Sequence, residues 1–364
     1  MSYQERKELY KKIQAERNHP LIVYVTSIRP NLSSSMASDV IPFIIEQIDL
    51  IDSSENEIDF MIVSNGGDPI TALRINSILR ERFKKINVLV PYVAYSAATI
   101  FSLGADSIIM GRYSNLGPVD PQITAHMKDS NGSVNNLQFG SEDLRYFIEF
   151  IKKDIGVHKE KNKLKACEAL LSNISGNIIG SAKRSQQLSL FLSEKMLSEH
   201  GYKKNKIKTI AKKLNLSYHH GYAFSRSEAI KMGLKIEKPS DNLEKLMWDI
   251  WKNFENEMKC NNVFDPMNEV MTDPSFERNL NNVPIIPLPA NNSPQAQQLI
   301  IQTIIPQIKL SNQTAFQQSA LLGCIESANV GYNISMILNI LAWRNFDMQI
   351  GINVTTSSPG WNKI

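Results

Sequence analysis

The sequence is poor in cysteine and has no motif typical of a metal centre. Its three cysteines, Cys167, Cys260 and Cys324, lie far apart, and no Cys/His pair has the spacing of a zinc site. A sparse and odd set of thiols fits a reducing compartment rather than a disulfide framework. We therefore expect no metal, no disulfides and a cytoplasmic location.

The sequence also lacks a strong charge bias and a long apolar run. It has 40 basic and 36 acidic residues, and a net charge of +4 is too small to indicate nucleic-acid binding. Lysines gather at residues 152–165 and 203–213, which we interpret as solvated helix faces. The longest apolar run, around residues 88–103, contains Ser96 and Thr99 and is too short for a membrane span. The first 18 residues are charged, unlike a secretory signal.

Short β-branched or aromatic runs alternate with segments of helical periodicity through the first part of the chain. Such alternation with short links indicates a mostly parallel sheet with crossover helices, an α/β fold. The expected strands are residues 21–26, 58–63, 86–93 and 107–110. The expected helices are residues 5–17, 39–51, 69–83, 96–103, 142–153, 177–197, 205–214 and 241–259.

The remainder of the chain differs in composition from this part. We expect residues 1–260 to form one α/β domain. Residues 261–312 are rich in Asn and Pro and have little periodicity, which predicts a linker or an irregular covering segment. Residues 313–364 hold apolar runs again and predict a small α+β carboxy-terminal unit, to which we assign no chemistry.

Two strand-to-helix corners could carry chemistry. After the strand at 58–63 come Gly66 and Gly67, and paired glycines permit positive φ and close approach of the backbone to a ligand. Amides in such a turn can bind an oxyanion. Ser96 stands at the next corner, where a helix amino terminus favours negative charge and small neighbours such as Ala97 leave room for substrate. The alternatives are an ordinary turn and a serine N-cap.

A third segment, residues 114–122, is an unusually stiff loop. Pro118 and Pro121 lie on either side of Asp120 and restrict the backbone around it. The loop would hold the carboxylate in a defined direction, as a site residue requires. The alternative is a turn carboxylate at the surface.

The order of these motifs resembles the ClpP/crotonase superfamily. Within it the sequence is most similar to the serine dehydrogenase proteinase family, relatives of SppA-type signal peptide peptidases. The similar segments are residues 62–68, 92–106, 114–122 and 220–234. The likeness covers about residues 20–240 and is weak over the last hundred. It implies a ClpP/crotonase-like spiral of ββα units with a small α+β carboxy-terminal extension, assembled as a homo-oligomer.

The resemblance further implies a serine peptidase that cleaves peptide or protein substrates through an acyl-enzyme. Ser96 would be the nucleophile. The amides of Gly66, Gly67 and Ala97 would form the oxyanion hole. No cofactor is implied.

The sequence does not decide which side chain is the general base. Clp peptidases carry a histidine after the nucleophile helix, where this chain has Val119 and Asp120. His220 is the first alternative, with Asp120 to orient its imidazole, and His219 competes with it. Lys183 is the second, since SppA-type enzymes use a lysine, but it would have to be buried to lose its proton.

Two other functions fit the same residues. Because the Clp histidine is replaced, the fold could serve as a catalytically inactive binding or scaffolding module. Because the crotonase fold shares the oxyanion geometry, the chain could instead act on an acyl thioester. We see no sequence signal for the coenzyme A pocket that this chemistry needs.

Overall fold

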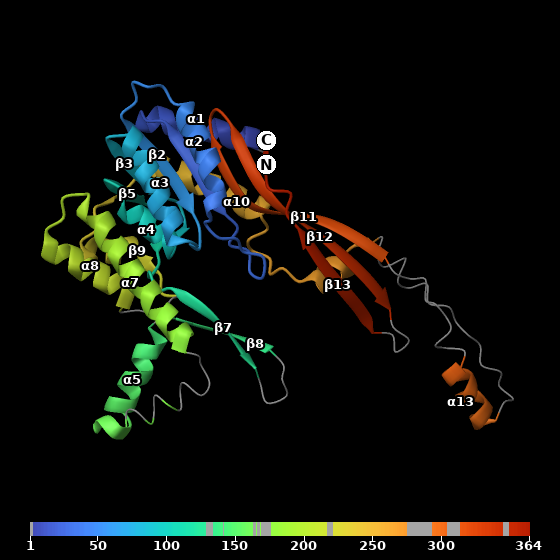
Figure 1. The fold of residues 1–364 in the computed structure, drawn as a ribbon. Coiled ribbons are helices and arrows are strands. Elements are labelled where there is room, and N and C mark those ends of the chain that lie inside the picture. Colours follow the sequence, from blue (N-terminus) through green and yellow to red (C-terminus); the bar gives the residue numbers. More distant parts are fainter. Residues whose placement is uncertain are drawn as a thin grey trace.

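The fold is an α/β sheet with helices on both faces (Figure 1). The computed structural model describes residues 3–128, 134–140, 142–162, 165, 168, 176–216, 221–274, 293–303, 314–344 and 349–364. The strands of the main sheet are β1 (Leu21–Thr26), β2 (Glu57–Val63), β3 (Lys85–Val90), β5 (Ser107–Met110), β10 (Ile236–Glu237), β11 (Thr314–Ser327), β12 (Gly331–Arg344), β13 (Ile350–Ser357) and β14 (Trp361–Lys363).

Parallel strands form the core of this sheet. Its order is β10-β5-β3-β2-β1-β11-β12-β13, and neighbours from β10 to β1 are parallel while those from β1 to β13 are antiparallel. β14 pairs with β12. The predicted α/β class and the strands predicted at 21–26, 58–63 and 107–110 are therefore confirmed. The strand predicted at 86–93 is divided at Pro91 into β3 and a short β4 (Val93–Ala94), because proline has no N–H for a ladder bond.

The side chains of each central strand alternate between two apolar layers. Phe60 of β2 and Val88 of β3 pack under one layer of helices, whereas Met61 and Leu89 pack under the other. Both layers consist of buried apolar side chains and form the core. The first layer contains α2 (Ile41–Asp49), α3 (Pro69–Arg82), α4 (Ala97–Leu103), α7 (Gly176–Ser198) and α8 (Lys204–Leu216), and the second contains α1 (Tyr3–Arg17) and α10 (Asp241–Glu257).

The remaining elements lie around this body. A hairpin of β7 (Gln122–Lys128) and β8 (Val134–Gly140) extends away from it together with α5 (Asp143–Lys153) (Figure 1). The other elements are η1 (Ser38–Val40), β6 (Asn115–Leu116), β9 (Phe224–Ser225), α9 (Arg226–Met232), α11 (Pro266–Met271) and α13 (Pro294–Thr303).

A small sheet of order β4-β6-β9 joins three segments that are distant in the sequence. Ala94, two residues before Ser96, pairs with Leu116, and Leu116 pairs with Phe224. The corner at Ser96, the stiff loop and the segment after His220 are therefore neighbours in space. This sheet lies at the carboxyl end of the parallel strands, where ligands of open α/β sheets bind.

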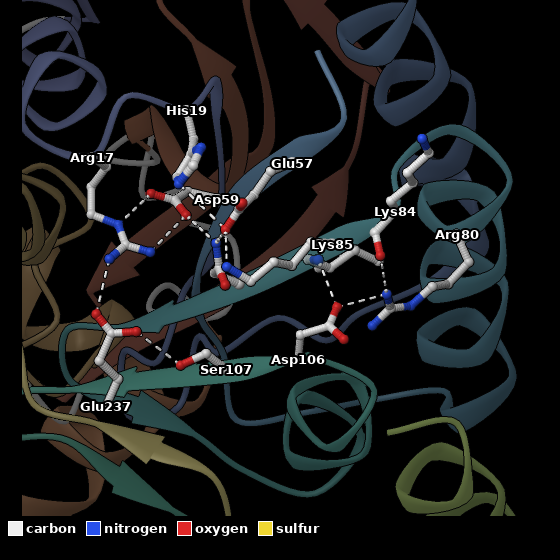
Figure 2. Close-up of polar contacts among 12 residues, drawn as sticks. Arg17, His19, Glu57, Asp59, Arg80, Lys84, Lys85, Asp106, Ser107 and Glu237 are labelled. Carbon is white, nitrogen blue, oxygen red and sulfur yellow. Dashed lines mark hydrogen bonds and ion pairs between the residues drawn. The ribbon is translucent and has the colours of Figure 1, made fainter. Parts of the chain in front are cut away.

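The opposite end of the sheet carries a network of structural ion pairs (Figure 2). Asp59 of β2 is fully buried and accepts hydrogen bonds from Arg17 at 2.9 Å and from Asn87 at 2.9 Å. Arg17 also contacts Glu237 at 3.0 Å. These contacts pair the buried charge and tie α1 to the strands that begin there.

The carboxy-terminal strands continue the main sheet. Along β1, Val25 pairs with Cys324 of β11 and Ile22 pairs with Ser327. A buried ion pair joins Arg6 of α1 to Glu326 of β11 at 2.6 Å. The elements described beyond residue 313 are strands. The end of β11 joins the main sheet beside β1, and the rest of the β11-β12-β13 ribbon extends away from the body (Figure 1). The domain boundaries expected at 260 and 312 stay predictions.

Candidate active site

Ser96 adopts a backbone conformation that few residues other than glycine adopt. It links β4 to α4 with φ 52° and ψ −115°. Positive φ at a residue with a side chain is uncommon, and such strain gathers at functional sites. The side chain makes no capping hydrogen bond to α4, so the N-cap interpretation does not account for it.

The diglycine turn lies directly against this serine. A Cβ added to Gly66 would come within 2.7 Å of the Ser96 Cβ and 2.6 Å of the Tyr95 carbonyl oxygen. The φ of Gly66 is +105° and that of Gly67 is +145°. Only glycine combines such angles with so close a contact. The sequence-based reason for the two glycines therefore agrees with the geometry.

The amides of the turn are not equivalent. Gly66 donates its N–H to the Ser64 Oγ at 3.0 Å, and its carbonyl accepts from the Met36 N–H at 2.7 Å. Because the peptide bond is planar and trans, the Gly67 N–H points away from Met36. Within the described ranges, no acceptor is assigned to the amide of Gly67 or of Ala97. Of the three predicted oxyanion donors, Gly66 is engaged, whereas Gly67 and Ala97 are available.

A cavity of about 570 Å³ opens over the turn and the serine. Its lining includes Gly67, Ser96 and Ile100, as well as Pro121 of the stiff loop. Helix α7 also contributes to the lining. The other lining residues are Ser35, Asn65, Gly66, Asp68, Pro69, Ser185, Leu188 and Ser189.

Asp120 is buried beside this cavity rather than exposed in a surface turn. Its loop is attached to α4, because the Thr99 Oγ1 donates to the Gly117 carbonyl and accepts from the Gly117 N–H at 3.1 Å. The next turn of the loop is held by α8, since the Val119 N–H donates to Leu214 at 2.8 Å. The expected stiffness of the loop thus comes from hydrogen bonds as well as from its prolines.

Of the three candidate general bases, the structure describes only Lys183. Lys183 on α7 is exposed, and its ammonium donates to the Gln186 Oε1 at 2.8 Å. It is not among the residues that line the cavity, so it lacks the burial that a neutral lysine needs. His219 and His220 lie outside the described residues.

Two parts of the site were missed by sequence reasoning. Met36 forms a bridge beside Gly67, and the polar face of α7 lines the cavity. Helical periodicity predicted α7, but periodicity carries no information on what a helix faces. Met36 stands in a polar loop without any pattern that would mark it.

In the described ranges, no group of three or more His, Cys, Asp or Glu side chains could hold a metal ion. No helix in the same ranges has the length and apolar character needed to cross a bilayer.

The part of the chain that contains the corner serine is similar to a known family of serine proteinases. Residues 44–138 match the model of the ClpP-like SDH-type serine proteinase family. This range contains the diglycine turn, Ser96 and Asp120, but neither Lys183 nor His220. The resemblance to serine dehydrogenase proteinases is thereby confirmed over the matched residues.

Two curated relatives are uncharacterized proteins of Methanocaldococcus jannaschii. One is 27% identical over 180 residues, which are 49% of this chain and 51% of the relative. The other is 39% identical over 69 residues, which are 19% of this chain and 24% of the relative. The match thus spans about half the length of one relative and a quarter of the other.

Three solved structures with a partly similar chain trace illustrate the comparison. A mutant of the 1510-N membrane-bound stomatin-specific protease is 15% identical, with a TM-score of 0.36 over 62% of this chain and 84% of that one. ClpP1 from Listeria monocytogenes is 13% identical, with a TM-score of 0.34 over 64% and 97%. The ClpP catalytic domain from Plasmodium falciparum is 13% identical, with a TM-score of 0.35 over 66% and 92%.

Proposed function

We propose that this protein is a serine peptidase that cleaves peptide bonds through an acyl-enzyme. The Ser96 Oγ attacks the scissile carbonyl carbon while a base takes the hydroxyl proton. The N–H groups of Gly67 and Ala97 donate to the resulting oxyanion. The base then gives its proton to the leaving amine, and water hydrolyses the ester to complete the cycle.

The observation that carries the proposal is the strained corner at Ser96. The backbone there is held at φ 52° against a glycine turn, and the serine lines a cavity. The hydroxyl has no capping role. A structural serine gains nothing from such a conformation, whereas a nucleophile gains an exposed hydroxyl next to amide donors.

Strand pairing supports His220 as the base and Asp120 as its orienting acid. Leu116 and Phe224 are an antiparallel pair. Asp120 follows Leu116 by four residues, and His220 precedes Phe224 by four, so both chains leave the pair in the same direction. Four residues reach at most about 14 Å, so neither Asp120 nor His220 can be farther than that from the pair. His219 and Lys183 are the alternatives.

Labelling with a fluorophosphonate probe tests the nucleophile. We expect the wild-type protein to be labelled and Ser96→Ala to be unlabelled while it keeps the wild-type melting temperature. Ser102→Ala is the matched control, because Ser102 is buried on the same helix and its hydroxyl only donates to the Ala98 carbonyl. Equal labelling of Ser96→Ala would exclude Ser96 as the nucleophile.

The same experiment addresses the second candidate, an inactive binding or scaffolding module. One observation favours that function. Lys183, the lysine that was the alternative general base, is exposed and does not line the cavity. It predicts an unlabelled wild-type protein that still forms stable complexes after Ser96→Ala.

We further propose peptide or protein substrates, a homo-oligomeric state and a cytoplasmic location. The sparse cysteines support the location, since the two described ones, Cys260 and Cys324, are both free and buried. Light scattering of the purified chain would measure the mass of the assembly.

A further inference from the structure

Two buried hydroxyl groups lie beneath the diglycine turn. Thr26 at the end of β1 is 2% exposed, and Ser64 after β2 is fully buried. The Thr26 Oγ1 donates to the Ser64 Oγ at 2.8 Å. The Ser64 Oγ in turn accepts the Gly66 N–H at 3.0 Å and lies 3.3 Å from the Gly66 carbonyl oxygen. A chain of hydrogen bonds therefore runs from β1 to the turn.

The hydrogen-bonding capacity of Ser64 is fully used in this chain. A hydroxyl has one proton to donate and two lone pairs to accept with. Here the lone pairs take the Thr26 hydroxyl and the Gly66 amide, and the proton is left for the Gly66 carbonyl. No capacity remains for a substrate or a water, so Ser64 acts on the turn alone.

The turn needs such support because a diglycine backbone is conformationally free. Gly66 and Gly67 both have positive φ, and glycine chains sample many other conformations. Ser64 accepts the Gly66 N–H of one peptide, and the Gly66 carbonyl of the next peptide accepts from both the Met36 N–H and the Ser64 hydroxyl. Fixing the Gly66 carbonyl fixes the Gly67 N–H, since the two belong to one planar peptide.

We infer that Thr26 and Ser64 are positioning residues, which aim the Gly67 amide at the oxyanion without touching the substrate. The inference rests on the proposed peptidase function. Preorganised donors are effective only where the charge develops, and a displacement of about 1 Å can lower a rate by about 10²-fold. Loss of either hydroxyl should slow acylation and leave substrate binding unchanged.

Thr26→Val is the most direct test, because valine keeps the shape of threonine and lacks the hydroxyl. The fluorophosphonate probe phosphonylates the serine hydroxyl with loss of fluoride. We expect the rate constant of this step at saturating probe to fall about 10-fold or more, with the half-saturating probe concentration unchanged. Thr26→Ser keeps the hydroxyl and loses a methyl group instead. Its rate constant for reaction with saturating probe should stay within about twofold of that of wild type, even if its melting temperature falls as far as that of Thr26→Val.

Ser64→Ala is the second test and should give the same loss of rate at unchanged half-saturation. Its control is Ser102→Ala, which removes an equally buried hydroxyl away from the turn. If Thr26→Val does not fold, the comparison of Ser64→Ala with Ser102→Ala decides whether the buried hydroxyls position the turn.

The possible outcomes separate the two proposals. An unlabelled wild-type protein overturns the peptidase function itself. A labelled wild type together with equal saturating rates for Thr26→Val and Thr26→Ser, or for Ser64→Ala and Ser102→Ala, overturns the positioning role only. A rise in half-saturation without a fall in rate would assign the hydroxyls to binding and would also overturn it.

Discussion

At the scale of single residues, the candidate site depends on a contact that admits no side chain. The Cα of Gly66 lies so close to Ser96 that an added Cβ would come within 3.0 Å of the Ala97 nitrogen and nearer still to Ser96. Those atoms are backbone and Cβ atoms, which cannot rotate out of the way. A substitution must therefore move the turn, the nucleophile or both.

Gly66→Ala should consequently abolish most of the fluorophosphonate labelling. We expect the labelling rate to fall about 100-fold or more, because a shift of about 1 Å misaligns the donors with the oxyanion. Gly180→Ala on α7 is the control, since an added Cβ there meets nothing within 4 Å. That variant should label like wild type and gain up to about 1 kcal/mol of stability from helix propensity. Wild-type labelling of Gly66→Ala would contradict the assigned geometry.

At the scale of elements, a capping box anchors the segment that follows the predicted base. Ser225 caps α9, and the Glu228 carboxylate accepts the Ser225 N–H at 2.9 Å and the Ser225 hydroxyl at 2.7 Å. The Tyr222 hydroxyl donates to the same carboxylate. The hydrogen bonds from Tyr222 and Ser225 lower the pKa of Glu228 from 4.5 to about 2.

This shift predicts a loss of stability in acid. A carboxyl group whose pKa is lower in the folded state stabilises the fold fully above its unfolded pKa, and the contribution disappears as the pH falls from about 4.5 to about 2. Glu228→Gln should melt at a lower temperature than wild type at pH 7, and the difference should shrink through this window. Melting curves at successive pH values measure it.

Glu81→Gln is the control for this prediction, because Glu81 is an exposed carboxylate on α3. Its melting temperature should follow that of wild type throughout. A Glu228→Gln curve that stays parallel to the wild-type curve from pH 7 to pH 2 would show that the cap does not respond to acid.

At the scale of the whole molecule, the two ends of the chain support each other. The Arg6 side chain is fully buried and bonds to Glu326 of β11, which also accepts a hydrogen bond from Tyr10. β11 covers the edge of β1, so the parallel sheet has no open edge there. Removal of β11 would expose that edge and take the fully buried Glu326 carboxylate away from Arg6, which would keep Glu257 and Asn253 as partners.

A chain that ends after residue 312 should therefore fail to fold. Such a chain loses the fully buried carboxylate of Glu326 that pairs with Arg6, and an uncovered strand edge promotes aggregation. A chain that ends after Arg344 keeps β11 and β12 and should remain soluble with a cooperative transition. Soluble yield and thermal unfolding curves of the two shortened chains test these expectations. A folded, monodisperse fragment of residues 1–312 would contradict this prediction.

Much of the fold could be read from the sequence, because local patterns decide local structure. Short β-branched runs and helical periodicity located β1, β2, β5 and the crossover helices. Turn chemistry located the diglycine bend and the corner at Ser96, since positive φ favours particular residues. Their catalytic roles stay predictions.

The tertiary structure decided which groups meet. Whether the Gly66 or the Gly67 amide is free depends on Ser64 and Met36, and no local pattern relates these residues to the turn. Likewise β11 pairs with β1 across most of the chain length, and such a pairing depends on burial and strand register rather than on neighbouring residues. The sequence by itself therefore determined the elements and the corner, whereas long-range hydrogen bonds and packing decided the direction of each donor.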